Sequence, residues 1–198
     1  MKAFIMGVLL FSNFESLDVF GPVEMFGSLP ERFKIIFIAE KKGLVKSAQN
    51  VLVKADFAFK NTPRLDILLI PGGIGTRKEV RNKNLLKWIN ATSNKTKLIL
   101  SVCTGSALLA KAHILDYHHA TSNKLAFDWV KLQGPNVQWI RKARWVEDGK
   151  IITSSGVAAG MDMSLYVIKK LYGEKISNEV IKNTEYIWNN NPNNDVFA

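Results

Sequence analysis

The stretch Leu98-Ile-Leu-Ser-Val-Cys103-Thr-Gly-Ser106 carries the pattern that decides the fold of this chain. The run Leu98–Val102 is short and apolar, which is typical of a parallel strand covered on both faces. A helical pattern begins at Gly105, so Cys103 falls on the turn between strand and helix. This is the geometry of a nucleophile elbow, with sulfur in place of a serine oxygen. The stretch therefore predicts a cysteine placed for chemistry at the edge of a sheet.

Strand and helix patterns alternate along the chain on both sides of this turn. Period-two and continuous apolar runs predict strands at Ala3–Phe11, Phe33–Ala39, Val51–Ala55, Ile67–Ile70 and Leu98–Val102. Periodic apolar positions predict helices at Leu17–Ser28, Asn84–Thr92, Gly105–Ala112, Lys124–Gln133, Met161–Tyr172 and Asn178–Trp188. This alternation predicts one α/β domain over residues 1–198, a flavodoxin-like three-layer sandwich with a mostly parallel sheet and helices on both faces.

The pattern changes between Val137 and Thr153, where no long helix fits. Apolar runs on either side of an Asp148-Gly149 turn predict a small β-hairpin, built from Val137–Ile140, Arg144–Val146 and Ile151–Thr153. The Asn-rich segment Asn189–Asn194 predicts an irregular or frayed tail over 189–198.

Composition and charge argue against several classes of protein. The net charge of +10 comes from scattered basic residues that form no helical stripe, so we expect no nucleic-acid partner. The apolar runs are too short to cross a bilayer and the N-terminal run lacks a cleavage site, so we expect a cytoplasmic protein with no membrane partner. One cysteine excludes an internal disulfide and a cysteine-based zinc site, and the three histidines lack ligand spacing. We therefore expect neither a metal nor a cofactor.

Two features beside the predicted elbow indicate how Cys103 reacts. A thiol at a helix N-terminus lies near unpaired N–H groups and the positive end of the helix dipole, which predicts a lowered pKa. The strand Ile67–Ile70 ends in Pro71-Gly72-Gly73, whose backbone N–H groups lie at the carboxyl edge of the sheet. We expect the N–H groups of Gly73 and Thr104 to stabilise a developing negative charge, as an oxyanion hole does.

Two acidic residues follow the first strand. Glu15 and Asp18 are three positions apart at the start of the predicted helix Leu17–Ser28 and can share one helical face. Both lie at the same edge of the sheet as Cys103. Because acids are common at helix N-termini for electrostatic reasons alone, the residues leave open whether either acid serves the cysteine.

Four segments in this order resemble the ThiJ/PfpI superfamily, which has the fold of class I glutamine amidotransferases, and within it the isonitrile hydratase branch. The segments are Leu17-Asp18 with Gly21-Pro22 and Ser28-Leu29-Pro30, then Ile70–Gly73, Ser101–Ser106 and Gly156–Asp162. The likeness runs from the first strand to about Trp188. It implies a cysteine-dependent lyase that adds water to an isonitrile and forms an N-substituted formamide. It also implies a homodimer, and exposed Trp and Phe side chains would suit its interface.

The resemblance implies roles for single residues. Cys103 matches the nucleophile, Thr104 the residue after it, and Asp18 the acid that faces the sulfur. Glu15 is the weaker candidate acid, because many other members use a glutamate in this region.

The substrate would contact a second group of residues. The glycine turn, Gly72 and Gly73, would lie against it, and apolar walls would come from Phe14, Phe20 or Ile74. Relatives usually have a histidine where this chain has Asn123, and no histidine follows the cysteine directly. A Cys–His dyad is therefore not expected. The change from histidine to Asn123 leaves open whether this chain acts on the same substrate as those relatives.

Other functions stay open. A cofactor-free glyoxalase or deglycase also uses an activated cysteine beside a carboxylate. The same fold occurs as the ligand-binding half of AraC-type transcription regulators, and a reactive thiolate also suits a redox sensor. Such a regulator is expected to carry a helix-turn-helix domain of about a hundred residues after the fold, which the sequence up to Ala198 does not contain.

Overall fold

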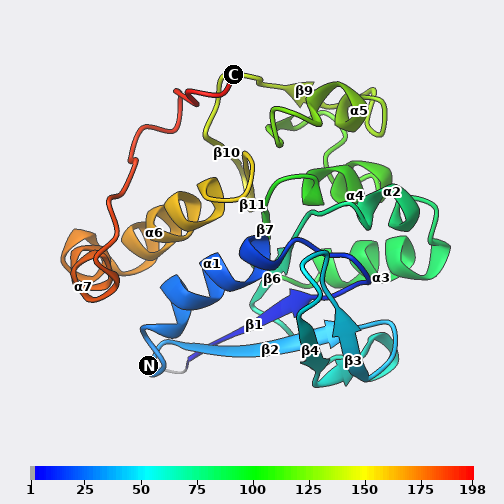
Figure 1. Cartoon of the computed structure of the whole chain (residues 1–198), viewed down its shortest axis with the longest axis horizontal. Helices are drawn as coiled ribbons and strands as arrows, with labels where there is room; N and C mark the ends of the chain where they lie inside the picture. The colour runs from blue at the N-terminus through cyan, green and yellow to red at the C-terminus, as the bar shows by residue number, and fades with distance from the viewer. Residues whose placement is uncertain (1–2) are drawn as a thin grey trace.

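The computed structural model describes residues 3–198 and has a seven-stranded sheet at its centre (Figure 1). The strand order is β10-β11-β7-β6-β1-β2-β5, and all neighbouring strands run parallel except β10 and β11. The strands are β1 Phe4–Leu9, β2 Phe33–Ala39, β5 Phe57–Ala58, β6 Ile67–Ile70, β7 Leu98–Ser101, β10 Trp145–Asp148 and β11 Ile151–Ser154. The mostly parallel sheet is confirmed, and β10 with β11 forms the hairpin predicted around Asp148-Gly149.

Helices cover both faces of the sheet and complete the three-layer sandwich (Figure 1). In one layer α1 and α7 pack against α6, and in the other α2, α3 and α5 pack against α4. The helices are α1 Ser16–Gly27, α6 Ala159–Tyr172, α7 Glu174–Thr184, α2 Thr76–Glu79, α3 Lys83–Ser93, α4 Gly105–Lys111 and α5 Phe127–Lys131. None of these helices, within residues 3–198, is long and apolar enough to span a membrane.

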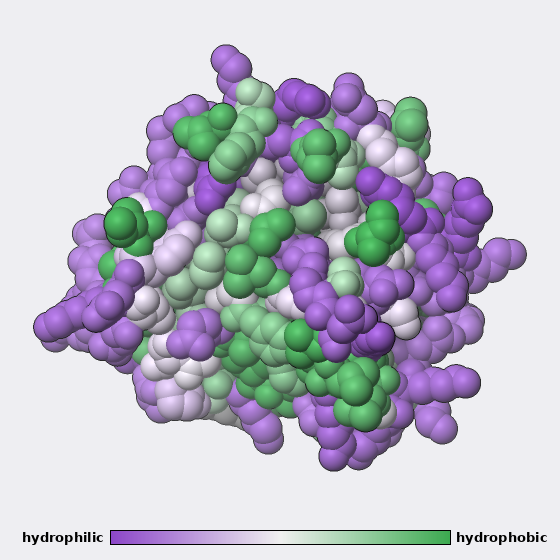
Figure 2. All heavy atoms as spheres, viewed as in Figure 1, coloured by the Kyte–Doolittle hydropathy of each residue, from purple (hydrophilic) through white to green (hydrophobic). Residues whose placement is uncertain are grey.

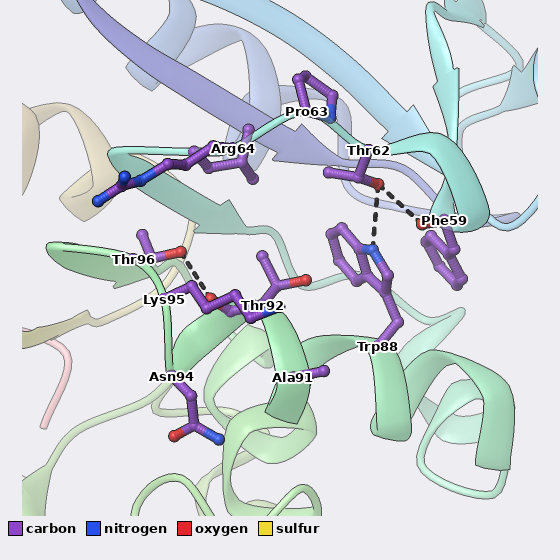
Figure 3. A pocket seen from close by; sticks show the side chains of 11 residues that line it. Phe59, Thr62, Pro63, Arg64, Trp88, Ala91, Thr92, Asn94, Lys95 and Thr96 are labelled. Atoms are coloured by element: carbon purple, nitrogen blue, oxygen red, sulfur yellow. Dashed lines mark hydrogen bonds between the residues drawn. The ribbon is translucent and has the colours of Figure 1, made fainter.

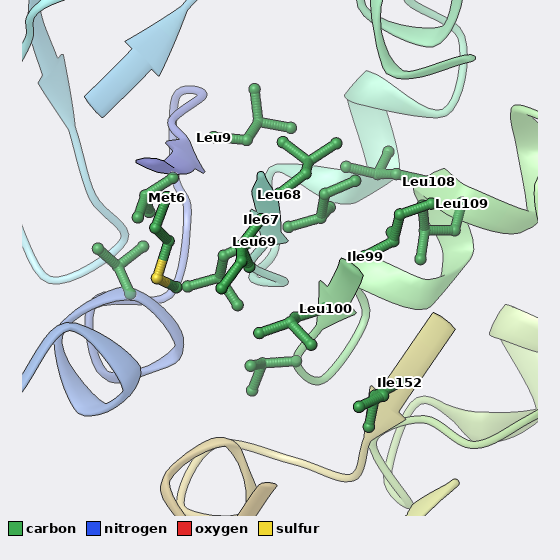
Figure 4. Close-up of a cluster of buried hydrophobic side chains, with 14 of the residues drawn as sticks. Met6, Leu9, Ile67, Leu68, Leu69, Ile99, Leu100, Leu108, Leu109 and Ile152 are labelled. Carbon is green, nitrogen blue, oxygen red and sulfur yellow. The ribbon is translucent and has the colours of Figure 1, made fainter. Parts of the chain in front are cut away.

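The central strands β6 and β7 are buried along their whole length. Figure 4 shows Leu68 and Leu69 of β6 in the middle of an apolar cluster, with Met6 of β1 on one side and Leu108 of α4 on the other. Their continuous apolar sequence arises because helices cover both faces of these strands. This packing fixes the point at which β7 ends, and so fixes the position of Cys103.

Two predicted strands pair differently from expectation. Strand β4, Leu52–Ala55, forms a separate antiparallel hairpin with β3, Gly43–Lys46, which no sequence pattern indicated. Strand β9, Gln138–Trp139, was expected in the β-hairpin but pairs in parallel with β8, His119–Ala120. These strands are short, and one run of side chains does not specify which partner it will meet.

The end of the chain also departs from expectation. Helix α7 spans 174–184 rather than 178–188, because Gly173 with a φ of 88° starts it and Glu185 with a φ of 49° ends it. The tail 189–198 has no helix or strand, and hydrogen bonds hold part of it against the domain. Asp195 is buried and its N–H donates to the Lys142 carbonyl, and the Pro192 carbonyl accepts from the Arg144 N–H at 2.7 Å.

Candidate active site

Cys103 lies on a sharp turn between β7 and α4, at the carboxyl edge of the sheet. Its φ of 56° is left-handed, a conformation that costs a non-glycine residue about 1–3 kcal/mol. Its N–H donates to the Ser155 carbonyl at 3.0 Å. Its carbonyl accepts from the hydroxyl groups of Ser106 at 3.1 Å and Ser122 at 2.9 Å. These bonds hold the strained turn in the elbow geometry.

Gly105 makes the turn possible because α4 starts directly against the end of β6. A Cβ at this position would lie 2.2 Å from the carbonyl oxygen of Ile70. No side chain fits at that distance, so the helix can follow the cysteine this closely only with glycine.

The Pro71-Gly72-Gly73 turn binds neighbouring side chains. Gly72 N–H donates to Oδ2 of Asp18 at 2.8 Å, and Gly73 N–H donates to Oγ1 of Thr104 at 3.0 Å. The Gly73 N–H expected in an oxyanion hole is thus occupied by the Thr104 hydroxyl in this structure, and the oxyanion hole of Gly73 and Thr104 stays a prediction. The Gly72 N–H instead orients the Asp18 carboxyl group.

Asp18 and Cys103 form a buried pair. The Asp18 carboxyl group is fully buried and Cys103 is only 6% exposed. The neighbouring Cys103 thiol lowers the carboxyl pKa, and Oδ1 of Asp18 is buried without a hydrogen-bond partner among residues 3–198. Glu15 does not contact the sulfur in this way, since its Oε2 accepts from Gln49 Nε2 at 2.9 Å. The geometry favours Asp18 over Glu15 as the acid beside the cysteine.

Burial dominates the electrostatics of this pair. It raises the pKa of Asp18 to about 7, in spite of the Gly72 N–H, which lowers it. Burial also raises the pKa of the Cys103 thiol, and the charge of Asp18 raises it further. The lowered thiol pKa expected from the helix N-terminus is thus wrong. A helix dipole contributes about 0.3–1 kcal/mol, whereas burying an ion costs several kcal/mol. The pair consequently goes from two protons to one as the pH rises through about 7, and the remaining proton belongs to the pair rather than to one residue.

Two backbone N–H groups, of Thr104 and Val157, hydrogen bond to the Cys103 sulfur and partly offset the effect of burial on its pKa. Val157 has a φ of 43°, a genuine outlier for a β-branched residue. The structure therefore places Thr104 and Val157, rather than Thr104 and Gly73, around the sulfur. Val157 lies in the segment Gly156–Asp162 that carries the family resemblance, but the sequence assigned it no role.

A small cavity of about 190 Å³ opens onto the sulfur. Of the predicted wall residues, Ile74 lines the cavity, whereas Phe14 is fully buried in the core and Phe20 is not part of the lining. Asn123 also lines it, and its Oδ1 accepts from the Ala126 N–H at 3.0 Å. The lining residues are Glu15, Gly73, Ile74, Arg77, Cys103, Thr104, Asn123, Ala126 and Val157. Sequence reasoning missed Arg77, Ala126 and Val157.

A larger cavity, of about 750 Å³, lies at the opposite edge of the sheet (Figure 3). Trp88 of α3 projects into it, stacks on Phe59 and donates from Nε1 to Thr62 Oγ1 at 3.1 Å. This cavity adjoins Leu65, just before the amino end of β6, whereas open α/β sheets bind ligands at the carboxyl ends of their strands. The smaller cavity beside Cys103 is the better candidate site.

The fold and this site define a class of protein: an α/β sandwich whose cysteine sits on a strained elbow beside a buried carboxyl group. The chain belongs to the DJ-1/PfpI family, whose family model matches residues 6–170.

Known proteins are similar over most of the chain. An isonitrile hydratase of Pseudomonas putida is 29% identical over 180 residues, which cover 91% of this chain and 77% of the hydratase. The HTH-type transcriptional regulator GbdR of Pseudomonas aeruginosa is 25% identical over 176 residues, which cover 86% of this chain and 47% of the regulator. The crystal structure of a ThiJ/PfpI family protein from Pseudomonas syringae has a TM-score of 0.87 and 30% identity, covering 94% of this chain and 76% of that protein.

Proposed function

We propose that this protein is an isonitrile hydratase, a lyase that adds water to R–N≡C and releases an N-substituted formamide. The observation that carries this proposal is the pairing of the buried Cys103 thiol with the buried Asp18 carboxyl group, beside a small cavity that opens onto the sulfur. It supplies a nucleophile and a proton acceptor in one place. The likeness to the isonitrile hydratase of Pseudomonas putida supports this reaction over the others open to a buried cysteine.

In the first half of the proposed reaction, Asp18 accepts the thiol proton as the Cys103 sulfur attacks the terminal carbon of the isonitrile. A C–S bond forms, and the carbon–nitrogen triple bond becomes a double bond. Asp18 then delivers its proton to the same carbon. The product is a thioimidate, R–N=CH–S–Cys103, beside an Asp18 carboxylate. Hydrogen bonds from Thr104 and Val157 N–H to the sulfur stabilise the thiolate that makes the attack.

In the second half, water adds to the thioimidate carbon. Asp18 takes one proton from the water as the C–O bond forms, and passes that proton to the nitrogen. The tetrahedral intermediate then collapses: the C–S bond breaks, a C=O bond forms, and the hydroxyl proton returns to the Cys103–Asp18 pair. One water is consumed, the formamide leaves, and the pair regains its single proton.

The test is incubation with a simple alkyl isonitrile, with the formyl proton of the product followed by NMR. We expect turnover by the wild type and none by Cys103→Ala or Cys103→Ser, with unfolding temperatures close to that of the wild type. The control substrate is methylglyoxal. Lactate formed from methylglyoxal, without formamide from the isonitrile, would assign a glyoxalase instead and overturn the proposal.

Ligand sensing is a second candidate function, which the likeness to GbdR favours. The chain spans 47% of that regulator, so the likeness concerns only part of it. Saturable binding of an isonitrile with no product would support sensing, and turnover would contradict it.

We also propose that the protein is a homodimer. Figure 2 shows apolar side chains gathered over β2 and the β3–β4 hairpin, where Leu44 is 67% and Leu52 59% exposed. None of the tryptophans in residues 3–198 is exposed, whereas Phe197 is 75% exposed. In sedimentation experiments we expect Leu44→Glu to produce monomers and Leu132→Glu, a change on another exposed leucine, to leave dimers. A monomeric wild type would refute this assembly.

The cytoplasmic location stays a prediction.

A further inference from the structure

Arg77 lies in the wall of the cavity that opens onto Cys103, on the short helix α2 that follows the glycine turn. The central carbon of its guanidinium group is 3.3 Å from the centre of the Trp129 ring. Such stacking is a cation–π interaction and holds the planar group in one orientation. Arg77 is therefore fixed at the cavity wall by the protein itself.

One donor of this fixed group has no acceptor. The Nη1 atom of Arg77 is buried and has no hydrogen-bond partner among residues 3–198. A buried polar group without a partner is destabilising, and most so when it is charged. Burial accordingly lowers the pKa of Arg77, while the nearby Cys103 raises it. A guanidinium group that the fold holds at this cost in the wall of a cavity indicates an acceptor that arrives with a ligand.

Glu15 is the only carboxylate among the described residues that line the cavity, and it already accepts a hydrogen bond from Nε2 of Gln49 at 2.9 Å. Arg77 is the only cation among the described residues that line the cavity. Arg77 is therefore the charged group of this cavity that still lacks a partner, and a ligand that pairs with it must carry a negative charge.

We propose that Arg77 binds a carboxylate group of the substrate and so positions the substrate's reacting carbon at the Cys103 sulfur. Guanidinium and carboxylate groups match in shape, with two parallel N–H···O bonds available. The cavity volume of about 190 Å³ limits the substrate to a small molecule. The inference rests on the proposed function and narrows it to small isonitriles that carry a carboxylate, such as an isocyanoacetate.

The test measures anion preference without requiring turnover. Iodoacetate and iodoacetamide are nearly the same size and alkylate the same sulfur, but only iodoacetate carries a carboxylate. Cys103 is the single cysteine of the chain, so intact mass reports alkylation at one site. The ratio of the two rate constants cancels any change in thiolate population and isolates the effect of the substrate charge.

We expect Arg77→Gln to lower the iodoacetate to iodoacetamide rate ratio about tenfold or more, the scale of one lost charge-assisted hydrogen bond. Arg77→Lys should retain part of the preference. Lys78→Gln, which removes a neighbouring exposed charge outside this cavity, should leave the ratio unchanged. An equal ratio in wild type and Arg77→Gln, or an equal loss in Lys78→Gln, would overturn the inference.

Measurements of turnover then distinguish a failure of this inference from a failure of the proposed function. We expect isocyanoacetate to have a larger kcat/KM than its uncharged methyl ester, and Arg77→Gln to remove the difference. If the ester is hydrated as fast as the acid, the hydratase stands and the role of Arg77 fails. If neither compound is hydrated but the alkylation ratio still depends on Arg77, anion binding stands and the hydratase fails.

Discussion

The Asp18 carboxyl group and the Cys103 thiol are electrostatically coupled at the carboxyl edge of the sheet, and the two side chains share a site that is almost closed to solvent. Burial raises the pKa of both groups, that of Asp18 to about 7. Two adjacent buried negative charges are unfavourable, so the thiolate forms only when Asp18 holds the proton. The reactivity of Cys103 therefore depends on proton transfer within the pair.

Replacing the acid should slow the reaction while leaving the nucleophile in place. We expect Asp18→Asn to lower kcat for isonitrile hydration by about 10²- to 10⁴-fold, the usual contribution of a general acid–base group. Glu15→Gln, a matched change at the cavity mouth, should cost much less because Glu15 does not contact the sulfur. Steady-state kinetics on both variants measures this. Equal losses would mean that Asp18 has no special role.

The raised pKa of Asp18 predicts how stability changes with pH. Its pKa rises from 3.8 to about 7 on folding, so the native state binds the proton more tightly than the unfolded state. This contribution is complete below about pH 4 and is lost as the pH rises through about 7. Relative to Asp18→Asn, the wild type should lose unfolding free energy over this range, by an amount on the order of a few kcal/mol.

Urea unfolding of both proteins at pH 4.5, 5.5, 6.5 and 7.5 measures this difference. Parallel curves for the wild type and Asp18→Asn would show that the carboxyl group is not held protonated by the fold.

The elbow should tolerate no side chain at Gly105. A Cβ there would lie 2.2 Å from the Ile70 carbonyl oxygen, so Gly105→Ala should destabilise the protein by about 2 kcal/mol or more. At Gly27 the nearest atom to an added Cβ is a side-chain carbon of Ile35 at 3.7 Å. Gly27→Ala should be neutral or stabilising because Ala favours a helix. Thermal unfolding that shows the same stability for both variants would contradict the tight packing at Gly105.

A buried ion pair should anchor the segment after α7. The Arg144 guanidinium contacts Oδ2 of Asp162 at 2.7 Å, and Oδ1 of Asp162 accepts from the Tyr186 hydroxyl at 3.0 Å. Asp162→Ala leaves the Arg144 charge buried without its main partner, which should cost about 3–5 kcal/mol. Asp128→Ala, which breaks the exposed pair with Arg141, should cost at most about 1 kcal/mol. Chemical denaturation distinguishes the two, and similar small losses would show that the buried pair contributes little.

The sequence allowed the elbow and the sheet to be predicted because their signals are local. The apolar run of β7, then Cys103 and Gly105, specifies strand, turn and helix within a few positions. The glycine turn after β6 indicates the edge of the sheet at which a ligand would bind. An acid at this edge could be predicted because Glu15 and Asp18 follow β1, whereas the choice of Asp18 came from the resemblance to the isonitrile hydratase branch.

What the sequence could not supply is which distant groups meet. Arg77 stacks on Trp129, and the Val157 N–H reaches the sulfur, across separations that no periodicity encodes. The sequence also predicted the wrong direction for the shift in the pKa of the Cys103 thiol. The helix start is visible in the residues, but the extent of burial around Cys103 is a property of the folded packing, and burial is the larger effect.

The most direct test of the central claim is the rate of Cys103 alkylation by iodoacetamide as a function of pH, in the wild type and in Asp18→Asn. For the wild type we predict a rate that rises up to about pH 7 and then levels off, because the thiolate becomes available once the pair holds one proton. For Asp18→Asn the plateau should be absent and the rate should keep rising beyond pH 9, because no carboxylate shares the thiol proton. Identical profiles for the two proteins would contradict the account, because the cysteine would then ionise without the help of Asp18.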